Sequence, residues 1–453
     1  MNPSIFRAYS IRGVVGRDLD ASDVRALGQA LGSAVLEAGG HTVVVGHDVR
    51  VHSPALAQAL VEGLCASGAE VRLLGLVPTP VLNFATDLLG ADAGVAVTAS
   101  HNPPDENGLK VRTDRTLLRP DLLALRARAE GGRLRTGKGR VHREEVRETY
   151  LGQVCARVRG APLGLRTVVD AGNGTNGPWA RALLERLGCQ VTLLHGEPDG
   201  TFPHRSPNPL DPGSLAALQE AVRTQGVDLG LAYDGDGDRL VVVDDRGEVV
   251  WADRVLALLA RQVLAERPGA RVVHEVLCTQ ALADDVRAHG GVPILSPVGY
   301  ALVHERMREV GAVLAGEMAG HFFFADPQFR FDDALLATAR VVETVARAGR
   351  PLSHLLADLP AYCTSPERRI PCSDGKKEQV VAALARVYRG RRPVDTLDGV
   401  RVQFEEGWGL VRASQTQAAL SMRFEARTSE ALAAIEAEIT AHVRALMGGE
   451  EHA

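Results

Sequence analysis

The sequence predicts an α/β protein in which three similar mixed α/β domains are followed by a C-terminal α+β domain. Two observations lead to this prediction. A pattern of strand, helix, strand, helix and strand occurs three times along the chain, which is typical of mainly parallel sheets covered by helices. After about residue 369 the pattern changes to short strands of alternating apolar and polar residues, which is typical of an antiparallel sheet with one buried face.

The repeated pattern can be followed strand by strand. Each copy opens on a β-rich run, and a helical stretch then leads to a second strand. A further helical segment leads to a third strand. The first strands are predicted at 42–46, 167–170 and 271–274, the second at 70–74, 190–194 and 292–295, and the third at 94–98, 228–232 and 312–315.

The last part of the chain is predicted to fold separately. Alternating segments at 399–404, 409–413 and 420–424 predict antiparallel strands. A helix follows, with Ser429 as its N-cap. Its apolar face is formed by Leu432, Ile435, Ile439, Val443 and Leu446. We therefore expect four domains, at residues 1–155, 156–256, 257–368 and 369–453.

Composition excludes several classes of protein. The 453 residues, 45% apolar and 24% charged, are those of an ordinary water-soluble protein with more than one core. The net charge of −5 argues against a nucleic-acid binder, which would carry a basic face. We expect no signal peptide and no membrane span. Because the six cysteines form no CxxC pair, we expect reduced thiols in a cytoplasmic protein. We expect this protein to be a monomer or a small homo-oligomer.

Each of the third strands runs into an unusual polar loop, at the edge where ligands of such sheets gather. In the first loop, residues 98–110, Ser100 stands beside His101 and upstream of Lys110. A hydroxyl placed near an imidazole and an ammonium could be a nucleophile or a phosphorylated residue. The alternative is a serine that bonds its own loop backbone.

The second loop predicts a metal site. Asp234, Asp236 and Asp238 place three carboxylates in five residues, and two of them about 4 Å apart would repel by roughly 1–4 kcal/mol. A divalent cation removes that penalty. A calcium-binding EF-hand does not fit, because its glycine and glutamate positions hold Arg239 and Asp245. Oxygen ligands beside an arginine favour Mg²⁺ in contact with a phosphate over a solvated acidic turn.

Two further loops carry groups suited to a sugar phosphate. In the loop 316–321, Glu317 could accept bonds from vicinal hydroxyls, and His321 could move a proton or bind a phosphate edge. Between two strands of the last domain, a guanidinium is joined by hydroxyl and amide donors, which suit a phosphate dianion. These donors are Arg412, Ser414, Gln415 and Thr416. A structural turn and an ordinary polar hairpin are the alternatives.

A glycine-rich segment opens a second hypothesis. Residues 170–177 contain a literal GxGxxG after a strand, and Glu197 lies about where a ribose-binding acid of a dinucleotide-binding dehydrogenase would be. Against this, Asp170 ends the strand where pyrophosphate would approach. Pro178 is typical of the first residue of an ordinary helix. The dehydrogenase hypothesis also leaves the aspartate loop unexplained.

Taken together, these segments resemble the α-D-phosphohexomutase superfamily, and within it the bacterial phosphomannomutase/phosphoglucomutase branch. The resemblance runs nearly end to end, and the combination of motifs is highly specific although no single one is. The segments that carry it are 6–13, 98–110, 234–239, 316–321, 331–333 and 407–414.

The resemblance implies three α/β domains and a fourth, TATA-binding-protein-like domain around one cleft. It implies that Ser100 is a phosphoserine in the active enzyme, and that Mg²⁺ is held by this phosphate with Asp234, Asp236 and Asp238. Arg239, Lys110 and His101 would serve the catalytic centre, with Lys110 or His321 moving protons. The loop of Glu317 and Ala319 would bind the sugar hydroxyls. The non-reacting phosphate would be bound by Arg412, Ser414, Gln415 and Thr416, with Tyr9 and Arg12.

The activity that follows from the resemblance is the interconversion of hexose 1-phosphate and hexose 6-phosphate, of mannose or glucose, through a 1,6-bisphosphate that turns round in the site. The bisphosphate would also serve as activator. Members of the family usually have lysine where Leu277 stands and histidine where Tyr300 stands. A phosphoglucosamine mutase and a sugar-phosphate sensor without turnover are the alternatives.

Overall fold

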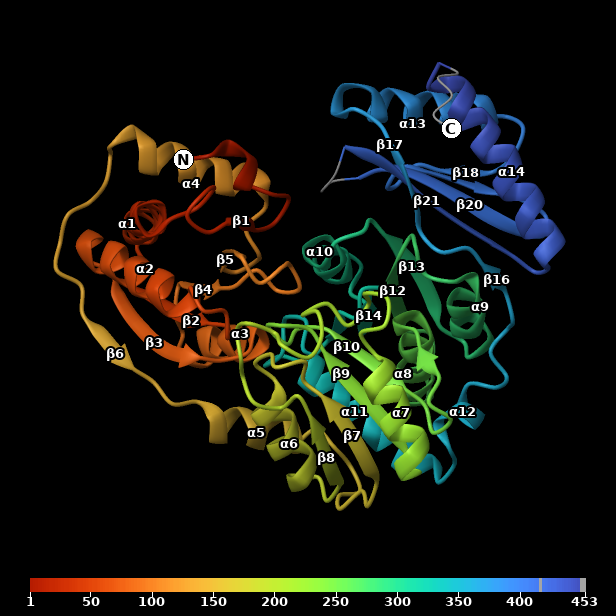
Figure 1. The fold of residues 1–453 in the computed structure, drawn as a ribbon, viewed down its shortest axis with the longest axis horizontal. Helices are drawn as coiled ribbons and strands as arrows, with labels where there is room; N and C mark the ends of the chain where they lie inside the picture. Colours follow the sequence, from red (N-terminus) through yellow and green to blue (C-terminus); the bar gives the residue numbers. More distant parts are fainter. Residues whose placement is uncertain (415–417, 449–453) are drawn as a thin grey trace. The chain divides into compact units, whose positions relative to one another are not determined.

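The computed structural model describes residues 1–414 and 418–448, which form two compact units. Unit 1 comprises Met1–Leu259 and Ala319–Ala357, and unit 2 comprises Ala260–Met318 and Asp358–Ala453. Figure 1 draws both, coloured along the sequence. Among the described residues, no helix is long and apolar enough to span a membrane.

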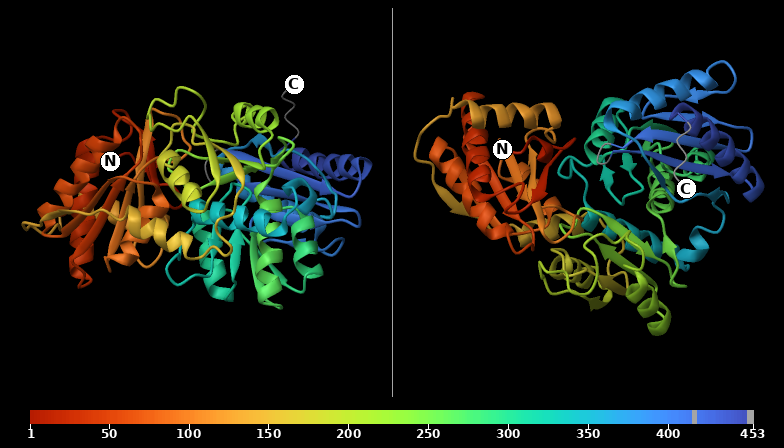
Figure 2. Two further views of the ribbon diagram at one scale, coloured as in Figure 1. Left: turned by 90° about the horizontal axis from the view of Figure 1, so that it is seen from below. Right: turned by 45° about the horizontal axis from the view of Figure 1, so that its top comes forward.

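The first sheet of unit 1 has the order β1-β5-β4-β2-β3-β6. Strand β2 is parallel to β3 and β4, whereas β5 is antiparallel to β4 and β1. Helices cover it, as the red and orange parts of Figure 2 show. The elements are η1 (Pro3–Ile5), β1 (Ile11–Val14), α1 (Ala21–Glu37), β2 (Thr42–His47), α2 (Ser53–Ser67), β3 (Glu70–Leu76), α3 (Thr79–Leu88), β4 (Ala93–Val97), β5 (Glu106–Arg112), α4 (Arg119–Gly131) and β6 (Val141–Arg143).

The second sheet of unit 1 has the order β11-β10-β9-β7-β8, with β7 parallel to β8 and β9 and with β10 antiparallel to β9. Helix α11 contacts α5, α6 and β10. The remaining elements of unit 1 are α5 (Arg147–Cys155), β7 (Arg166–Asp170), α6 (Gly177–Arg186), β8 (Gln190–Leu194), α7 (Ala216–Gln225), β9 (Leu229–Tyr233), β10 (Leu240–Val243), β11 (Val249–Val250), β15 (Phe322–Phe324), α11 (Ala334–Ala348) and α12 (Leu352–Leu355), and α8 (Ala252–Glu266) begins in unit 1 and continues into unit 2.

Unit 2 contains the third repeat and the C-terminal sheet. Strand β12 is parallel to β13 and β14, and the C-terminal sheet is built from antiparallel pairs. The elements are β12 (Arg271–Glu275), α9 (Gln280–Ala288), β13 (Val292–Ser296), α10 (Tyr300–Val310), β14 (Leu314–Gly316), β16 (Cys363–Thr364), β17 (Arg368–Pro371), α13 (Asp374–Tyr388), β18 (Val394–Asp395), β19 (Val400–Gln403), β20 (Gly407–Ala413), β21 (Ala419–Ala426) and α14 (Ser429–Leu446).

The predicted threefold repeat is confirmed, because the third, first and second strands of each copy lie in that order. They form β4-β2-β3, β9-β7-β8 and β14-β12-β13. The polar loops begin where β4, β9 and β14 end, so each loop starts at the carboxyl edge of its own sheet. The fold class is therefore as predicted. The C-terminal sheet already begins at β16, and the division into four domains at the expected residues stays a prediction.

Candidate active site

The serine of the first polar loop lies just after the end of β4, in a turn. Ser100 is buried, with 1% of its surface exposed. Its φ of 52° is in the left-handed region, which a residue other than glycine adopts when its surroundings hold it there. Its Oγ donates to Asp234 Oδ2 at 2.8 Å and lies 3.1 Å from His101 Nδ1. The turn therefore directs the hydroxyl at the acidic loop of the second repeat.

This turn is held by Arg50, which sequence reasoning missed. The Arg50 side chain is fully buried. Its Nη1 and Nη2 atoms donate at 2.5–2.9 Å to four backbone carbonyls of the loop, those of Ser100, Asn102, Pro103 and Glu106. One planar guanidinium can satisfy four carbonyls only if they are arranged around it, so Arg50 determines the shape of the loop.

A buried carboxylate in turn fixes Arg50. Asp48 Oδ2 lies 3.2 Å from Arg50 Nε and accepts from Thr98 Oγ1 at 2.7 Å. Burial raises the pKa of Asp48, and the charge of Arg50 opposes this. Both residues follow β2 directly, so an acid and an arginine after a buried strand were the signal available in the sequence.

The three aspartates predicted to bind a metal do converge. Carboxylate oxygens of Asp234, Asp236 and Asp238 lie within 4.8 Å of one another, and all three residues are buried. Gly237, with a φ of 75°, allows the chain to turn between them. Asp236 Oδ1 and Asp238 Oδ1 are buried and have no hydrogen-bond partner among the described residues. Unpartnered anionic oxygens on a glycine-bearing loop fit a hard divalent cation.

A lysine and a threonine from the first repeat reach the same carboxylates. Lys110 Nζ lies 2.7 Å from Asp236 Oδ2 and 2.5 Å from Asp238 Oδ2. Thr79 Oγ1, another contact that the sequence did not indicate, donates to Asp236 Oδ2 at 2.6 Å. The ammonium of Lys110, which is 7% exposed, therefore offsets part of the negative charge.

The surroundings shift the pKa values of two of the aspartates in opposite directions. Burial raises the pKa of Asp234 to about 7, and the neighbouring carboxylates of Asp238 and Asp236 add to the shift. Burial acts in the same direction on Asp236, but the charge of Lys110 outweighs it and lowers the pKa of Asp236 below its ordinary value. The cost of ionising Asp234 falls as positive charge near it increases, so the site favours a cation beside this carboxylate.

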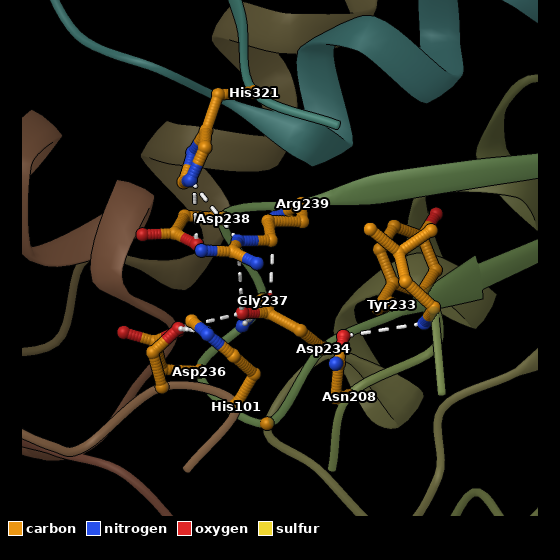
Figure 3. A network of polar contacts seen from close by, with 12 residues as sticks. His101, Asn208, Tyr233, Asp234, Asp236, Gly237, Asp238, Arg239 and His321 are labelled. Carbon is orange, nitrogen blue, oxygen red and sulfur yellow. Dashed lines mark hydrogen bonds and ion pairs between the residues drawn. The ribbon is translucent and has the colours of Figure 1, made fainter. Parts of the chain in front are cut away.

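On the other side of the carboxylates, Arg239 and His321 form a hydrogen-bonded chain with Asp332. Arg239 Nε donates to His321 Nε2 at 3.0 Å, which leaves His321 Nδ1 as the donor to Asp332 Oδ2 at 2.6 Å. Burial would lower the pKa of His321, but Asp238 and Asp332 outweigh it and raise the pKa. Figure 3 shows His321, Arg239 and the aspartates directed toward one another. Asp332 lies in the segment 331–333, which carried the resemblance without an assigned role.

The predicted residues His101 and Arg12 complete this group in unit 1. Burial, with the charges of Arg239 and Arg12, brings the pKa of His101 well below its ordinary value, so the imidazole is neutral. Arg12 Nη1 donates to Asn102 Oδ1 at 2.7 Å. Tyr9 is half-buried in the segment before β1.

The glycine-rich segment after β7 packs against the aspartate loop. Thr175 Oγ1 donates to the carbonyl of Gly235 at 2.9 Å, and Asn176 Nδ2 donates to that of Gly237 at 3.0 Å. A Cβ atom on Gly174 would lie 2.9 Å from the Gly235 carbonyl oxygen, closer than side chains pack. Gly174 of the GxGxxG pattern thus allows the two backbones to approach, and the segment supports the aspartate loop.

Three further predicted residues, Glu317, Arg412 and Ser414, lie in unit 2. Glu317 Oε1 accepts from the Gly299 amide at 2.6 Å. Arg412 Nη2 pairs with Asp398 Oδ2 at 3.0 Å. Ser414 is buried and comes directly after the end of β20, the strand that contains Arg412. Burial raises the pKa of Glu275 to about 8, with the nearby Glu317 adding to it.

Some predicted positions behave differently from these. Gln415 and Thr416 lie outside the described residues. Ala319 is half-buried. Leu277 is buried in an apolar cluster with Val276, Trp408 and Leu410. Its side chain is therefore part of the packing of unit 2, which gives a physical reason for an apolar residue there.

Four family models together match most of the chain. They are described as phosphoglucomutase/phosphomannomutase alpha/beta/alpha domains I, II and III and the C-terminal domain. They match residues 3–122, 148–247, 251–362 and 367–442.

Individual proteins are similar over nearly their whole length. A phosphomannomutase/phosphoglucomutase of Pseudomonas aeruginosa is 42% identical, over 96% of this chain and 94% of its own. A probable phosphoglucosamine mutase of Methanopyrus kandleri is 36% identical, over 94% of each chain. A crystal structure of a phosphoglucomutase/phosphomannomutase family protein from Burkholderia thailandensis superimposes with a TM-score of 0.94 at 39% identity, over 100% of this chain and 99% of that one.

Proposed function

The chain belongs to the phosphoglucomutase/phosphomannomutase family and is a phosphohexomutase, and on this premise we propose that Ser100 is the residue that gives and takes back the phosphoryl group. The observation that supports this most directly is the 2.8 Å hydrogen bond from Ser100 Oγ to Asp234 Oδ2, within a group of buried carboxylates and cations. A phosphate on Ser100 Oγ would begin at the edge of the aspartate loop.

The donor set suits Mg²⁺ as the cofactor. Asp234, Asp236 and Asp238 would hold it together with a phosphoserine oxygen, since two of their carboxylate oxygens are buried without a partner among the described residues. A magnesium ion bound there neutralises charge on the transferring phosphoryl group. Arg239 would supply further positive charge to its oxygens, and so would Lys110 while it is protonated.

The first transfer moves a phosphoryl group from the enzyme to the sugar. A hydroxyl oxygen of hexose 1-phosphate attacks phosphorus, the bond from phosphorus to Ser100 Oγ breaks, and a hexose 1,6-bisphosphate forms. The hydroxyl proton passes to a base, for which Lys110 and His321 are the candidates. In the second transfer Ser100 Oγ attacks the other phosphate, and the proton returns to the sugar oxygen that is released. Phosphate, proton and charge are thereby conserved over the cycle.

The bisphosphate must present both of its ends in turn, so the groups that hold it must accept either end. We assign sugar hydroxyls to Glu317 and the loop of Ala319. We assign the non-reacting phosphate to Arg412 and Ser414 with Gln415, Thr416, Tyr9 and Arg12. Guanidinium and hydroxyl donors fit a phosphate dianion regardless of which carbon carries it. The same bisphosphate would act as activator by phosphorylating Ser100.

Hexoses of the manno or gluco series are the proposed substrates, with glucosamine phosphate as the second candidate. The similarity to the probable phosphoglucosamine mutase of Methanopyrus kandleri favours keeping that candidate. We also propose the four-domain division at 155/156, 256/257 and 368/369. A cytoplasmic monomer or small oligomer without nucleic-acid partners fits the free thiols of the six cysteines and the net charge of −5.

The test compares the parent protein with Ser100→Ala in the presence of Mg²⁺ and a hexose 1,6-bisphosphate. We expect Ser100→Ala to lower turnover of glucose 1-phosphate by several orders of magnitude, because the variant lacks the oxygen that is proposed to carry the phosphate. Intact mass should show one phosphate on the parent and none on the variant. Ser22→Ala, on the exposed start of α1, is the control.

Near-normal rates in Ser100→Ala would contradict the assignment of the nucleophile. Parallel assays with mannose 1-phosphate and glucosamine 1-phosphate decide the sugar. A protein that binds these sugars without forming product would be a sensor.

A further inference from the structure

Unit 2 contains a cavity of about 680 Å³ that includes none of the residues assigned to phosphoryl transfer. One wall is the edge strand β13, with Pro293, Ile294 and Leu295. The other walls are α9, α10, strands β12, β18 and β19, and the segment after β18. Its volume is in the range of sites that take a small organic ligand.

Three guanidinium groups from three different elements line this cavity: Arg287 of α9, Arg306 of α10 and Arg401 of β19. Two of them have partial partners. Arg287 Nη1 lies 3.2 Å from Asp284, and Arg306 Nη1 lies 3.0 Å from Glu309, each within its own helix and with both side chains partly exposed.

Arg401 differs from the other two, because it is buried. It is 7% exposed, and its guanidinium stacks 4.1 Å from the centre of the Trp408 ring. Its hydrogen bond is to an uncharged group, from Nη2 to Gln280 Oε1 at 3.3 Å. Nε is buried without a partner among the described residues, and the nearest acidic charges, those of Glu425 and Asp395, act on Arg401 without forming an ion pair with it. Burying a cation without a direct ion pair is costly, and a protein that keeps one is expected to use it.

The acidic residues that act on this charge, Glu425 and Asp395, form no ion pair with Arg401 among the described residues. Asp395 is the carboxylate that lines the cavity, against the three arginines. Nε of Arg306 is likewise buried without a partner among the described residues. Donors from three elements thus surround a space that holds one acid.

We propose that this cavity binds a small polyanion that carries two or more phosphate or carboxylate groups. Arg401 would supply a buried bidentate contact, Arg287 and Arg306 would bind the outer charges, and Leu295 with Leu397 would contact the apolar part of the ligand. Guanidinium forks match both phosphate and carboxylate, so the shared chemistry is that of a multiply charged anion.

Such a ligand would act on the C-terminal sheet. Arg401 lies opposite Leu410 in the pairing of β19 with β20, and Arg412 stands two residues further along β20. An anion that joins Arg401 to Arg287 and Arg306 would tie this sheet to the third repeat. The site is therefore placed to regulate the strand that carries Arg412.

The experiment is isothermal titration of the full-length protein with pyrophosphate and, separately, with citrate, in the absence of added metal. Arg401→Met keeps the contact with Trp408 but removes the charge, and Arg287→Gln changes a largely exposed side chain. Arg308→Gln, an exposed arginine of α10 that does not line the cavity, is the matched control. All four proteins share the same phosphate-binding residues elsewhere, so differences between them report on this cavity.

We expect at least one of the two anions to bind the parent protein and the control equally. Arg401→Met and Arg287→Gln should each bind that anion with an affinity about 10-fold lower than the parent, since each loses one charged contact. The tighter of pyrophosphate and citrate identifies the ligand as an organic phosphate or a polycarboxylate. Equal affinity in all four proteins, or no binding of either anion to the parent, would overturn the proposal. If Arg401→Met does not fold, Arg287→Gln decides.

Discussion

Arg50 illustrates how a single side chain determines the geometry of the serine turn. It donates to four backbone carbonyls of the loop that carries Ser100, and it is fully buried. Lysine has the same charge but one nitrogen, so most of these carbonyls would lose their donor. A buried carbonyl without a partner costs about 1–3 kcal/mol, which is enough to let the turn relax.

We therefore expect Arg50→Lys to lower kcat by about 10²-fold, since a displacement of about 1 Å at a reacting group has an effect of that size. The thermal unfolding midpoint should fall as well. Arg25→Lys, at a side chain that is 62% exposed, is the control for the exchange itself. Unchanged turnover in Arg50→Lys would show that the turn keeps its shape without this guanidinium.

Asn176 makes a comparable contact on the metal side of the site. Its Nδ2 donates to the Gly237 carbonyl, between two of the aspartates that would bind Mg²⁺. We expect Asn176→Ala to weaken binding of a divalent cation by about 10–100-fold, as loss of a group that orients metal ligands does. Direct titration with Mn²⁺ followed by magnetic resonance measures this without turnover. Asn2→Ala, in the N-terminal turn, should bind like the parent protein.

These contacts also show which candidate site residues can be recognised from the sequence alone. Ser100 and the three aspartates stand in short motifs whose composition is unusual by itself. Arg50, Thr79 and Asn176 make their contacts across 50 or more residues of sequence, and nothing near them in the chain marks the partner. Candidate residues that stand together in one short loop could therefore be predicted, whereas the distant contacts that hold such a loop in place could not.

At the scale of an element, helix α11 begins at a buried carboxyl group whose pKa is raised. Asp333 accepts from the amides of Leu335 and Leu336, both at 2.9 Å, and from the hydroxyl of Tyr150 at 2.8 Å. Burial raises the pKa of Asp333 to about 7, although these donors oppose the shift. The folded state thus holds the proton of Asp333 more tightly than the unfolded state, whose pKa is near 3.8.

The sign of the pH effect follows from this difference. Below about pH 4 the carboxyl is protonated in both states and contributes nothing to the pH dependence. Between about pH 4 and pH 7 the unfolded state ionises first, so this group lowers the free energy of unfolding as pH rises, by on the order of a few kcal/mol in total. Above about pH 7 the effect is constant. Asp333→Asn keeps an oxygen acceptor for the helix and does not titrate.

We expect Asp333→Asn to remove this decline, so that the variant gains stability relative to the parent as pH rises from 4 to 7. Denaturant unfolding at several pH values, monitored by circular dichroism, measures it. The same pH dependence in both proteins would mean that Asp333 ionises in the folded state at its ordinary pKa.

The order of the strands was predictable at this scale because buried strands and helices alternate with characteristic lengths. The threefold pattern placed each third strand, and hence each polar loop, at the carboxyl edge of a sheet. Element boundaries were less well determined. The C-terminal sheet begins at β16, six residues before the expected boundary at 369, since a two-residue strand such as Cys363–Thr364 has no periodicity of its own.

For the whole molecule, the central question is how far folding depends on the metal. Lys110 Nζ already lies 2.7 Å from Asp236 and 2.5 Å from Asp238, so part of the charge of the acidic loop is balanced by the chain itself. Protein with a chelator should therefore remain folded and lose turnover. A ligand that binds the folded state adds RT ln(1 + [L]/Kd) to the free energy of unfolding. Because the chelator removes this contribution, the thermal unfolding midpoint should fall by a few degrees.

Circular dichroism and an activity assay with a chelator, followed by addition of Mg²⁺, measure both effects. Recovery of turnover on adding Mg²⁺ is the expected result. Full activity in excess chelator would contradict the assignment of Asp234, Asp236 and Asp238. Unfolding on chelation would show instead that Lys110 does not compensate for the cation.

The sequence by itself determined the fold class, the threefold repeat, the family and the polar loops that are proposed to carry the chemistry. Each of these depends on residues close together in the chain, through periodicity or local composition. Only the tertiary structure decided that Asp234 receives the hydrogen bond of Ser100, that Arg50 shapes the serine turn and that the buried Arg401 forms no direct ion pair among the described residues. Such features arise from side chains that meet across long stretches of sequence, and the free energy of those contacts leaves no periodic pattern to read.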